Sequence, residues 1–379
     1  MPLPTLNLKS GIASGAWAEV RLDRMVNNLQ VIRSFQSSQT RVMAIVKANG
    51  YGHGLLESAR ALAPHVHYLG VSSIREVMVL KENKIPTPVF LLGRLFPEEI
   101  PAVLTDGVTL SVSSFEEASA ISEASLAHKR RTVIHVKIDT GMGRLGIPFG
   151  LAVKTIEKIA VLPGIIMEGV YTHFPSSESD ENFTEGQVRD FTLVLQALEK
   201  KGITFALRHA ANSAGSLKIR TPIFNMIRPG LMLYGLYPDD SLRAAAEVAP
   251  ALSLKSRVLT VKRLQTGQSV GYGRTFTADK PCTVGILSCG YSHGYPFAAA
   301  KNARVLFQGQ KLALAGRVSM DYMAVNFGDL RPQPGDEVTL IGEELGQSIG
   351  AEDLAGWSNT IPYEIVTGLS AFLPRIYTA

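Results

Sequence analysis

Between residues 15 and 245, short apolar runs rich in β-branched residues alternate with stretches in which apolar residues recur every three or four positions. The first pattern predicts buried strands and the second predicts amphipathic helices. Eight strand candidates occupy residues 41–47, 68–72, 89–93, 108–112, 133–139, 165–174, 205–211 and 224–228. Eight strand–helix units predict a closed parallel (β/α)8 barrel, with a doubly wound open sheet as the alternative. We favour the barrel because eight units close it.

Some of the predicted helices can be placed from their sequence patterns. A helix ahead of the first strand is marked by apolar residues at helical spacing, Leu22, Met25, Leu29 and Ile32. Ser114 with Glu117, and Thr184 with Gln187, have the spacing of capping boxes, in which two side chains satisfy free amides at a helix start. The second pair predicts a helix that ends at Gly202. Its buried face should carry Val188, Phe191, Leu195 and Leu198.

After about residue 245 the pattern changes to short β-rich runs separated by Gly, Pro and Asp. Strand candidates occupy residues 257–264, 283–287, 303–307, 311–315, 322–326 and 337–341. We therefore predict two domains: a barrel over residues 1–245 and a mainly β domain over residues 246–379, connected through residues 244–250. The first 14 or so residues could pack with the second domain instead of the barrel.

Polar side chains gather where the predicted barrel strands end. Lys47 ends the first strand and leads into a glycine-rich turn, and the later strands end at Lys137 and Asp139, His173, Asn212 and Ser213, and Arg228. Each alone has an ordinary explanation as a surface charge, a helix cap or a satisfied core histidine. Because the carboxyl ends of the strands meet at one edge of a barrel, the set together predicts an active site there. A lysine in a site that disfavours its charge can supply a neutral amine.

Composition is that of a soluble globular enzyme: 379 residues, of which 46% are hydrophobic and 19% charged. A net charge of +5 permits an anionic ligand, but the basic residues are too scattered to indicate nucleic acid. Cys282 and Cys289 form no disulfide framework, and we expect reduced thiols, with a disulfide between them left open. The start of the chain does not resemble a signal peptide, and no apolar run approaches membrane-spanning length. We therefore expect a cytoplasmic protein.

The segment VKANGYGHG, residues 46–54, resembles the attachment site of pyridoxal 5'-phosphate (PLP) in alanine racemases, where the lysine holds the cofactor. Six further stretches resemble the same family in order and spacing: KIDTGMGR at 137–144, YTHF at 171–174, HAANS at 209–213, RPGLMLYG at 228–235, GYG at 271–273 and GRVSMD at 316–321. PYE at 362–364 extends the resemblance to nearly the whole chain. It implies a PLP-dependent isomerase with a barrel and a mainly β domain.

The resemblance also implies how the cofactor is held. Its phosphate would lie where the seventh and eighth strands end, against Asn212, Ser213, Gly230 and Leu231, with Tyr51 and Tyr363 as phenol donors. Arg228 would face the pyridine nitrogen and keep it unprotonated, because a guanidinium does not give up its proton. Arg144 would hold the cofactor phenolate and help to place the substrate carboxylate. In this family Lys137 is often carbamylated and then pairs with that arginine.

Racemisation needs two bases on opposite faces of the substrate Cα. By resemblance Lys47 is one, and Tyr272, contributed by the partner in a homodimer and hydrogen-bonded to His173, is the other. Met320 and Asp321 would also reach across the dimer to the small amino-acid substrate. The implied role is supply of D-alanine for peptidoglycan.

The chain departs from the family pattern near the substrate entrance. His293 and Phe297 stand where the family usually has Asp and Arg, which puts the polar entrance in doubt, and Ser319 stands where Cys is common. A racemase for serine or for a broader set of amino acids also stays open, because the size of the pocket depends on geometry that the sequence does not give.

Two hypotheses from other classes remain. A non-enzymatic PLP-binding barrel protein would need no second domain. A barrel metallohydrolase could use His173, His209, Asp139 and Lys137, but His65 and His67 precede their strand. We predict no metal.

Overall fold

The computed structural model describes residues 15–379, so the expectation for the first 14 residues lies outside the described residues. The chain divides into two compact units. The barrel unit comprises Met25–Gly50 and Leu55–Val248. Of the described residues, the β unit comprises residues 15–24, the short segment Tyr51–Gly54, and Ala249–Ala379.

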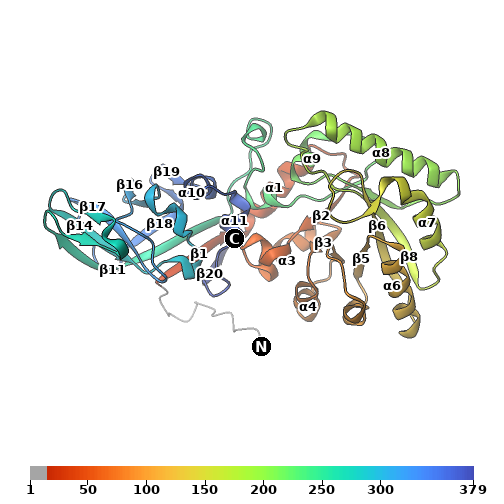
Figure 1. The fold of residues 1–379 in the computed structure, drawn as a ribbon, viewed down its shortest axis with the longest axis horizontal. Helices are drawn as coiled ribbons and strands as arrows, with labels where there is room; N and C mark the ends of the chain where they lie inside the picture. The colour runs from red at the N-terminus through yellow and green to blue at the C-terminus, as the bar shows by residue number, and fades with distance from the viewer. Residues whose placement is uncertain (1–14) are drawn as a thin grey trace. The chain divides into compact units, whose positions relative to one another are not determined.

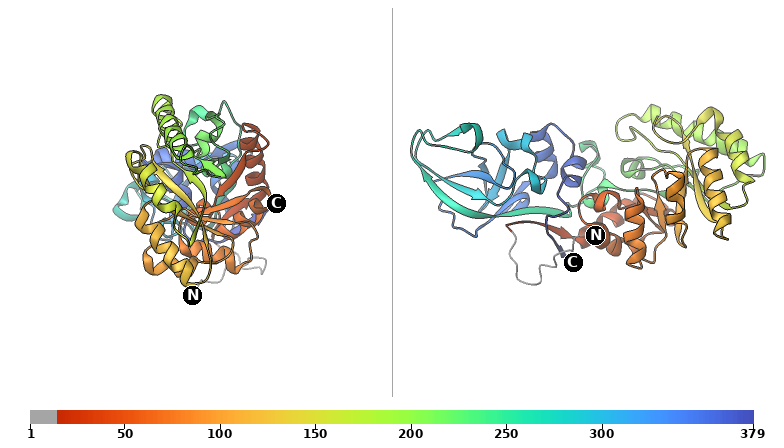
Figure 2. Two further views of the ribbon diagram at one scale, coloured as in Figure 1. Left: turned by 90° about the vertical axis from the view of Figure 1, so that its right-hand side faces the viewer. Right: turned by 60° about the horizontal axis from the view of Figure 1, so that its bottom comes forward.

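Eight parallel strands close the barrel (Figure 1; Figure 2). In sequence they are β2 (Arg41–Ile45), β3 (Tyr68–Val71), β4 (Val89–Leu91), β5 (Val108–Val112), β6 (Thr132–Asp139), β8 (Ile165–Tyr171), β9 (Leu207–His209) and β10 (Met226–Ile227). Pairing of β5 with β6 and of β10 with β2 completes the ring, and the two-residue β7 (Ile147–Pro148) is added to β6. All eight predicted strands are confirmed, and closure decides for the barrel against the open sheet.

Helices lie outside the strands (Figure 1). They are α1 (Leu22–Ser34), α3 (Leu55–Leu62), α4 (Ile74–Glu82), α5 (Ile100–Val103), α6 (Phe115–Ala127), α7 (Ala152–Ala160), α8 (Glu181–Glu199) and α9 (Ser213–Lys218). Because helices cover one face of the strands and the barrel interior the other, strands such as β5 are buried at every residue. This explains why the strands are near-continuous apolar runs in the sequence. The predicted helical pattern before the first strand is confirmed as α1, which buries Met25, Leu29 and Ile32.

The predicted start of α8 at Thr184 is wrong. The helix begins at Glu181, and its N-cap is Asp180, whose carboxylate accepts a hydrogen bond from the amide of Phe183. Asp180 caps one turn earlier than Thr184, which lies inside the helix and donates its hydroxyl to the Asp180 carbonyl. The buried face is correspondingly Thr184, Gln187, Phe191, Val194 and Leu198. The cap at Ser114 is confirmed, although the Glu117 carboxylate accepts from the amide of Ser113 and so does not complete the box.

The β unit is built around the long strand β11 (Leu252–Leu264), which pairs with β1 (Ala16–Arg21), β14 (Cys282–Leu287) and β18 (Glu337–Glu344). Its other elements are β12 (Ser269–Val270), β13 (Phe276–Thr277), β15 (Arg304–Phe307), β16 (Gln310–Ala313), β17 (Met323–Gly328), β19 (Gln347–Ile349), α10 (Ala351–Ser358), α11 (Pro362–Thr367) and β20 (Arg375–Thr378). All six predicted strands are confirmed, whereas β1 and β20, which pair in parallel, were not predicted.

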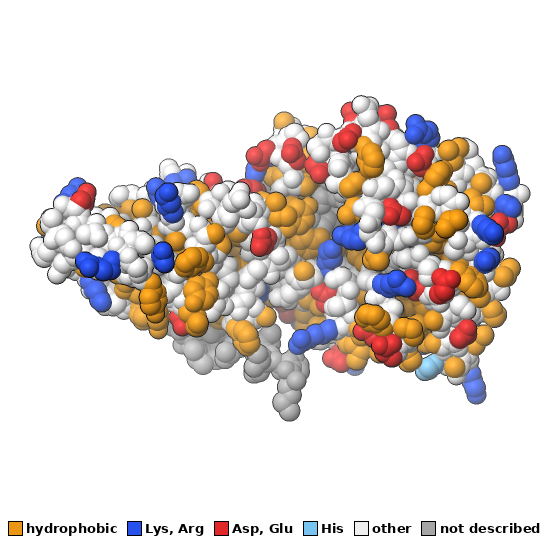
Figure 3. Space-filling view, viewed as in Figure 1, with side chains coloured by type: hydrophobic (Ala, Val, Ile, Leu, Met, Phe, Trp, Pro, Cys, Tyr) orange, Lys and Arg blue, Asp and Glu red, His pale blue; other side chains and the backbone are white. Residues whose placement is uncertain are grey.

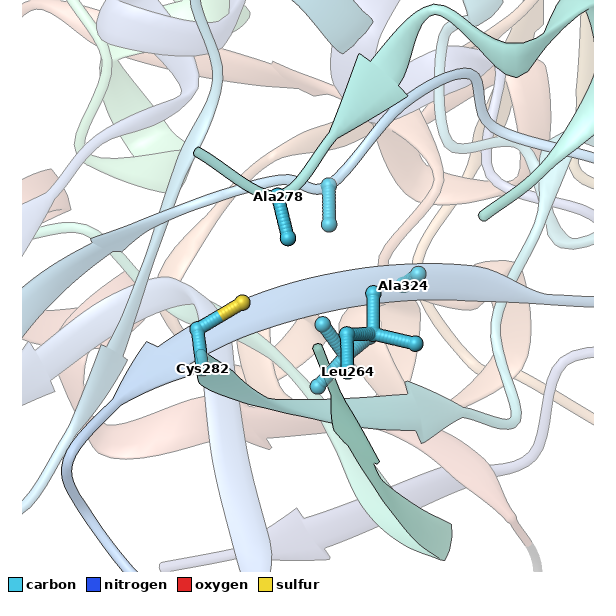
Figure 4. Close-up of a cluster of buried hydrophobic side chains, with 6 residues drawn as sticks. Leu264, Ala278, Cys282 and Ala324 are labelled. Carbon is cyan, nitrogen blue, oxygen red and sulfur yellow. The ribbon is translucent and has the colours of Figure 1, made fainter. Parts of the chain in front are cut away.

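One small core of the β unit is formed by Leu264, Ala278, Cys282, Val284, Ala315 and Ala324. Figure 4 shows these side chains facing one another between neighbouring strands. Cys282 and Cys289 are both buried free thiols. Over the part of the chain that the structure describes, the helices are too short or too polar to cross a membrane. On the face drawn in Figure 3, basic side chains are interspersed with acidic ones.

Replacing Asp180 with Ala should open the first turn of α8 more often, because the Phe183 amide loses its acceptor. Loss of such a cap costs about 1 kcal/mol, which corresponds to roughly fivefold faster exchange of that amide. Hydrogen–deuterium exchange followed by mass spectrometry measures this directly. Asp180→Asn is the matched control and should exchange like the parent, since Asn caps as well as Asp. Equal exchange in all three proteins would show that Asp180 is not the cap.

Candidate active site

Lys47 begins a turn of unusual handedness at the end of β2. Ala48, Asn49, Gly50 and Tyr51 all have positive φ, at 53, 55, 60 and 51°. Left-handed backbone costs an L-residue roughly 1–2 kcal/mol, so the surrounding hydrogen bonds must hold the turn. The Asn49 side chain accepts from the amide of Leu55, and the Asn49 amide donates to Glu76. Such strain is typical of functional sites.

Two lysine amines near the barrel mouth have lowered pKa values. Burial lowers the pKa of Lys47, and the charge of Arg144 adds to the effect. Burial, followed by the charges of Arg228 and Arg144, lowers the pKa of Lys137 to about 8. The Lys137 ammonium also lies 5.6 Å from the centre of the Tyr171 ring. Both amines therefore have a larger neutral fraction near pH 7 than an ordinary lysine.

Arg228 is buried and its guanidinium fills the space between neighbouring strand ends. Nη2 donates to the carbonyls of Thr172 and Ala210 at 2.8 and 3.0 Å and to Nδ1 of His173 at 3.2 Å, while Nη1 donates to Nδ1 of His209 at 2.8 Å. A guanidinium only donates, so both Nδ1 atoms must be bare. Burial, together with the charge of Arg228, holds the pKa of each histidine well below its usual value, so both imidazoles are neutral.

Ser213, Gly230 and Asn212 lie together at the ends of β9 and β10. The Ser213 hydroxyl accepts from the amides of Gly230 and Met232 at 3.0 and 3.3 Å. Asn212 is the N-cap of α9 and accepts from the amide of Gly215. Leu231 follows directly as the first residue of a 3-10 turn. Because both amides donate to the Ser213 oxygen, its own O–H is left as the donor that an anion would meet here.

The loop from Asp139 to Arg144 has a carboxylate with a structural role at its start and an exposed cation at its end. Asp139 accepts from the amides of Gly141 and Gly143 and so fixes the loop. Arg144 is exposed, and its charge contributes to the lowered pKa values of Lys47, Lys137 and His173.

This arrangement argues against the metallohydrolase hypothesis, because Asp139 is engaged by amides. Both nitrogens of His209 are also engaged, one by Arg228 and the other by His135.

The remaining predicted residues belong to the β unit. The rings of Tyr51 and Tyr363 lie 6.2 Å apart, so the structure brings these two phenols together from distant parts of the sequence. Burial, followed by the nearby Tyr363, raises the pKa of Tyr51. Tyr272 is 74% exposed between two glycines of positive φ, Gly271 and Gly273.

Met320 and Asp321 belong to the same unit as Tyr272. Met320 is exposed, and Asp321 accepts from the Ser292 hydroxyl at 2.8 Å. A hollow of about 330 Å³ beside Tyr272 is lined by Arg317, Ser319 and Tyr322 among others.

The sequence patterns did not predict two polar residues inside the barrel. His135 and Glu168 are hydrogen-bonded to each other beneath the site. A signal for His135 exists, because it alternates with Lys137 and Asp139 along one strand and so shares their face. The sequence carries no comparable signal for Glu168.

Known proteins resemble this chain over nearly its whole length. Residues 20–238 match the model of the alanine racemase N-terminal domain, and residues 251–377 match that of the alanine racemase C-terminal domain. An alanine racemase of Desulforamulus reducens is 37% identical over 366 residues, which cover 95% of this chain and 98% of that protein.

Solved structures show the same similarity. An alanine racemase of Clostridium difficile 630 has a TM-score of 0.92 at 31% identity, covering 97% of this chain and 96% of the other. A histidine racemase of Leuconostoc mesenteroides has a TM-score of 0.88 at 26% identity, covering 97% of this chain and 99% of the other.

The pKa of Lys137 predicts its reactivity toward acetic anhydride. At pH 8 about half of its amine is neutral, compared with less than about 1% for an ordinary lysine. Peptide mapping by mass spectrometry across a pH series should therefore give a labelling midpoint near pH 8 for Lys137. Lys154, exposed on α7, is the internal reference. A midpoint for Lys137 near that of ordinary lysines, at roughly pH 10, would contradict the electrostatic account of the site.

Proposed function

The chain belongs to the alanine racemase family, and on that basis we propose that it is an isomerase that interconverts L-alanine and D-alanine with PLP. The observation that carries the proposal is Lys47. It is half-buried, has a lowered pKa and follows the first strand of a closed barrel. This is the position of the lysine in the motif that the family uses to hold its cofactor.

The residues around Lys47 fit PLP. Its lowered pKa favours the neutral amine that covalent attachment needs. Ser213 with the amides around Gly230 and Leu231, supported by Asn212, suits a phosphate. When bound, PLP would supply an electron-withdrawing ring that acidifies the proton on the substrate Cα.

Other predicted residues add donors and charges of the right kind for the cofactor. Arg228 is a cation that keeps its proton, which suits a partner for a ring nitrogen that stays bare. Tyr51 and Tyr363 add phenol groups for the phosphate, and Arg144 adds a cation for the phenolate oxygen. All of these assignments follow from the family pattern and the chemistry of each side chain.

We assign the two bases to Lys47 and to Tyr272 of a second copy of the chain. Each acts on one face of the substrate Cα, one removing a proton and the other delivering one. His173 supports the second base. Because its Nδ1 accepts from Arg228 and the ring is neutral, its Nε2 carries a hydrogen. That N–H can donate to the Tyr272 oxygen and so favour the phenolate.

The substrate carboxylate is held by Arg144 and by the backbone of Met320, with Asp321 adjacent. Lys137, with a pKa of about 8, has the neutral amine that carbamylation by carbon dioxide needs, and the resulting carbamate would pair with Arg144. We propose a cytoplasmic homodimer with shared active sites that supplies D-alanine for peptidoglycan. The exposed Tyr272 and Met320 support sharing, because each is available to a second subunit.

A racemase for serine or for a broader range of amino acids is the second candidate. The similarity to a histidine racemase shows that this fold accepts a larger side chain in another protein. In this chain Phe297 is 52% exposed and its ring packs edge-on against Tyr291 at 6.4 Å, where the family usually has an arginine. An aromatic entrance tolerates substrates that a charged one would repel.

An assay of racemisation with purified protein and PLP tests the function. We expect L-alanine and D-alanine to interconvert faster than serine, lysine, arginine or histidine, as measured by chiral chromatography. Borohydride should fix the cofactor covalently on Lys47, as located by peptide mass spectrometry, and Lys47→Ala should lose both the label and the activity. Attachment to another lysine, or faster turnover of one of the other amino acids, would replace the respective part of the proposal.

Mixing two inactive variants tests the shared site. In a heterodimer of Lys47→Ala and Tyr272→Phe subunits, one site contains both bases and the other contains neither. Random exchange in a two-fold dimer should therefore restore about a quarter of the parent activity. Each variant alone, and the double variant mixed with either, should stay inactive. Absence of recovery after proven subunit exchange would show that both bases come from one chain.

A further inference from the structure

A chain of hydrogen bonds leads from Arg228 into the barrel core. Arg228 donates to Nδ1 of His209, Nε2 of His209 lies 2.8 Å from Nδ1 of His135, and Nε2 of His135 lies 2.9 Å from Oε2 of Glu168. The Tyr68 hydroxyl donates to the same carboxylate oxygen. Both imidazoles are fully buried, whereas the Glu168 side chain is 28% exposed.

Arg228 at one end and Glu168 at the other determine which nitrogen donates in each hydrogen bond between them. Arg228 can only donate, so Nδ1 of His209 is bare and Nε2 carries the hydrogen of the neutral ring. That N–H then donates to a bare Nδ1 of His135, whose Nε2–H donates to the Glu168 carboxylate. The hydrogen bond from His135 holds the pKa of Glu168 below its usual value, and burial lowers the pKa of His135. Both ends therefore demand the same pair of tautomers.

The pairing of β6 with β8 leaves room for these hydrogen-bonded side chains. The register of β6 on β8 slips between Ile134 and His135, so that Glu168 is the extra residue of a bulge and His135 is the partner of Gly169. A Cβ on Gly169 would lie 2.7 Å from the His135 ring, so an ordinary side chain there would displace the imidazole. The His209 ring stacks on Tyr171 at 4.8 Å, and Phe90 packs against His135 at 4.8 Å.

Packing alone does not explain these residues. Barrel interiors are usually filled by branched apolar side chains, and replacing a buried polar group by an apolar one of similar volume is often neutral or stabilising. A chain in which every imidazole nitrogen is satisfied rigidifies what it holds. The group held at its buried end is Arg228.

We propose that His135 and Glu168 are positioning residues that act through His209 to fix the orientation of the Arg228 guanidinium and to keep its acceptor unprotonated. The proposal rests on the proposed function in one respect, the role of Arg228 opposite the cofactor. The negative charge of Glu168 balances the buried cation from the far end of the chain, and neither residue touches the reacting atoms.

Nitrogen NMR of histidine-labelled, ligand-free protein tests the chain without any activity. Among the eight histidines, His135 and His209 should be neutral with the hydrogen on Nε2. In Glu168→Gln the Nε2–H proton of His135 should move upfield, because a neutral acceptor makes a weaker hydrogen bond, while His209 keeps its tautomer. A hydrogen on Nδ1 of His209, or a doubly protonated ring, would overturn the proposal whatever the substrate.

Enzyme assays test the consequence for Arg228. With the amino acid that the protein racemises, Glu168→Gln should lower kcat/KM about tenfold and weaken PLP binding in an equilibrium titration, with the melting temperature unchanged. Glu168→Asp, which keeps the charge, should recover part of both. Gly169→Ala should reproduce the loss by displacing His135, and His128→Gln, at the exposed residue that follows α6, is the matched control without effect. Parent-like kcat/KM and PLP affinity in Glu168→Gln would show that the hydrogen bonds from Arg228 to Glu168 contribute only to packing.

Discussion

The buried positive charge of Arg228 is the constraint on which the open end of the barrel depends. Since a guanidinium offers only donors, each group that faces it must present an acceptor, and carbonyls and bare imidazole nitrogens do so. After burial itself, the same charge lowers the pKa values of Lys137, His173 and His209. One lasting cation thus keeps the two histidines neutral and enlarges the neutral fraction of Lys137, and neutral nitrogens are the forms that accept protons near neutral pH.

Strand order explains why these groups meet. The strands β6, β8, β9 and β10 are consecutive neighbours in the ring, and β10 pairs with β2. Lys137 lies near the end of β6, whereas His173, Asn212 and Arg228 follow β8, β9 and β10 in turn, and Lys47 follows β2. Parallel pairing directs all of their carboxyl ends to one edge, so residues separated by most of the barrel sequence become adjacent. Closure of the ring is therefore a condition of the site as well as of the fold.

Sequence patterns predicted the features that follow from burial of apolar residues. They did not predict the features that depend on how paired strands are aligned. Parallel strands buried on both faces must be apolar runs, and those runs were found with their polar ends. The start of α8 was misplaced because Thr184 and Asp180 are both good caps, and which one is used depends on tertiary packing. The left-handed turn at Ala48 and Asn49 was not predicted, because no residue types mark it in the sequence except the glycines that follow.

Other misses have the same origin. The chain from His209 to Glu168 depends on a bulge that brings Glu168 opposite His135, and a bulge is a property of two paired strands. The strands β1 and β20 were missed because their partners lie at the far end of the sequence.

The cations at the barrel mouth explain why an anionic ligand would stabilise the folded protein. Lys137 has a pKa of about 8 in the folded chain and a higher one when unfolded. Between those values the unfolded chain binds more protons, so stability rises with pH through this window, and below it the full cost of the crowded charge is present. Lys47 contributes in the same direction. A bound phosphate or carboxylate favours the charged forms, raises both pKa values and removes that cost at neutral pH. The ligand would therefore relieve the electrostatic repulsion among these cations when it binds. That relief contributes to its affinity for the site.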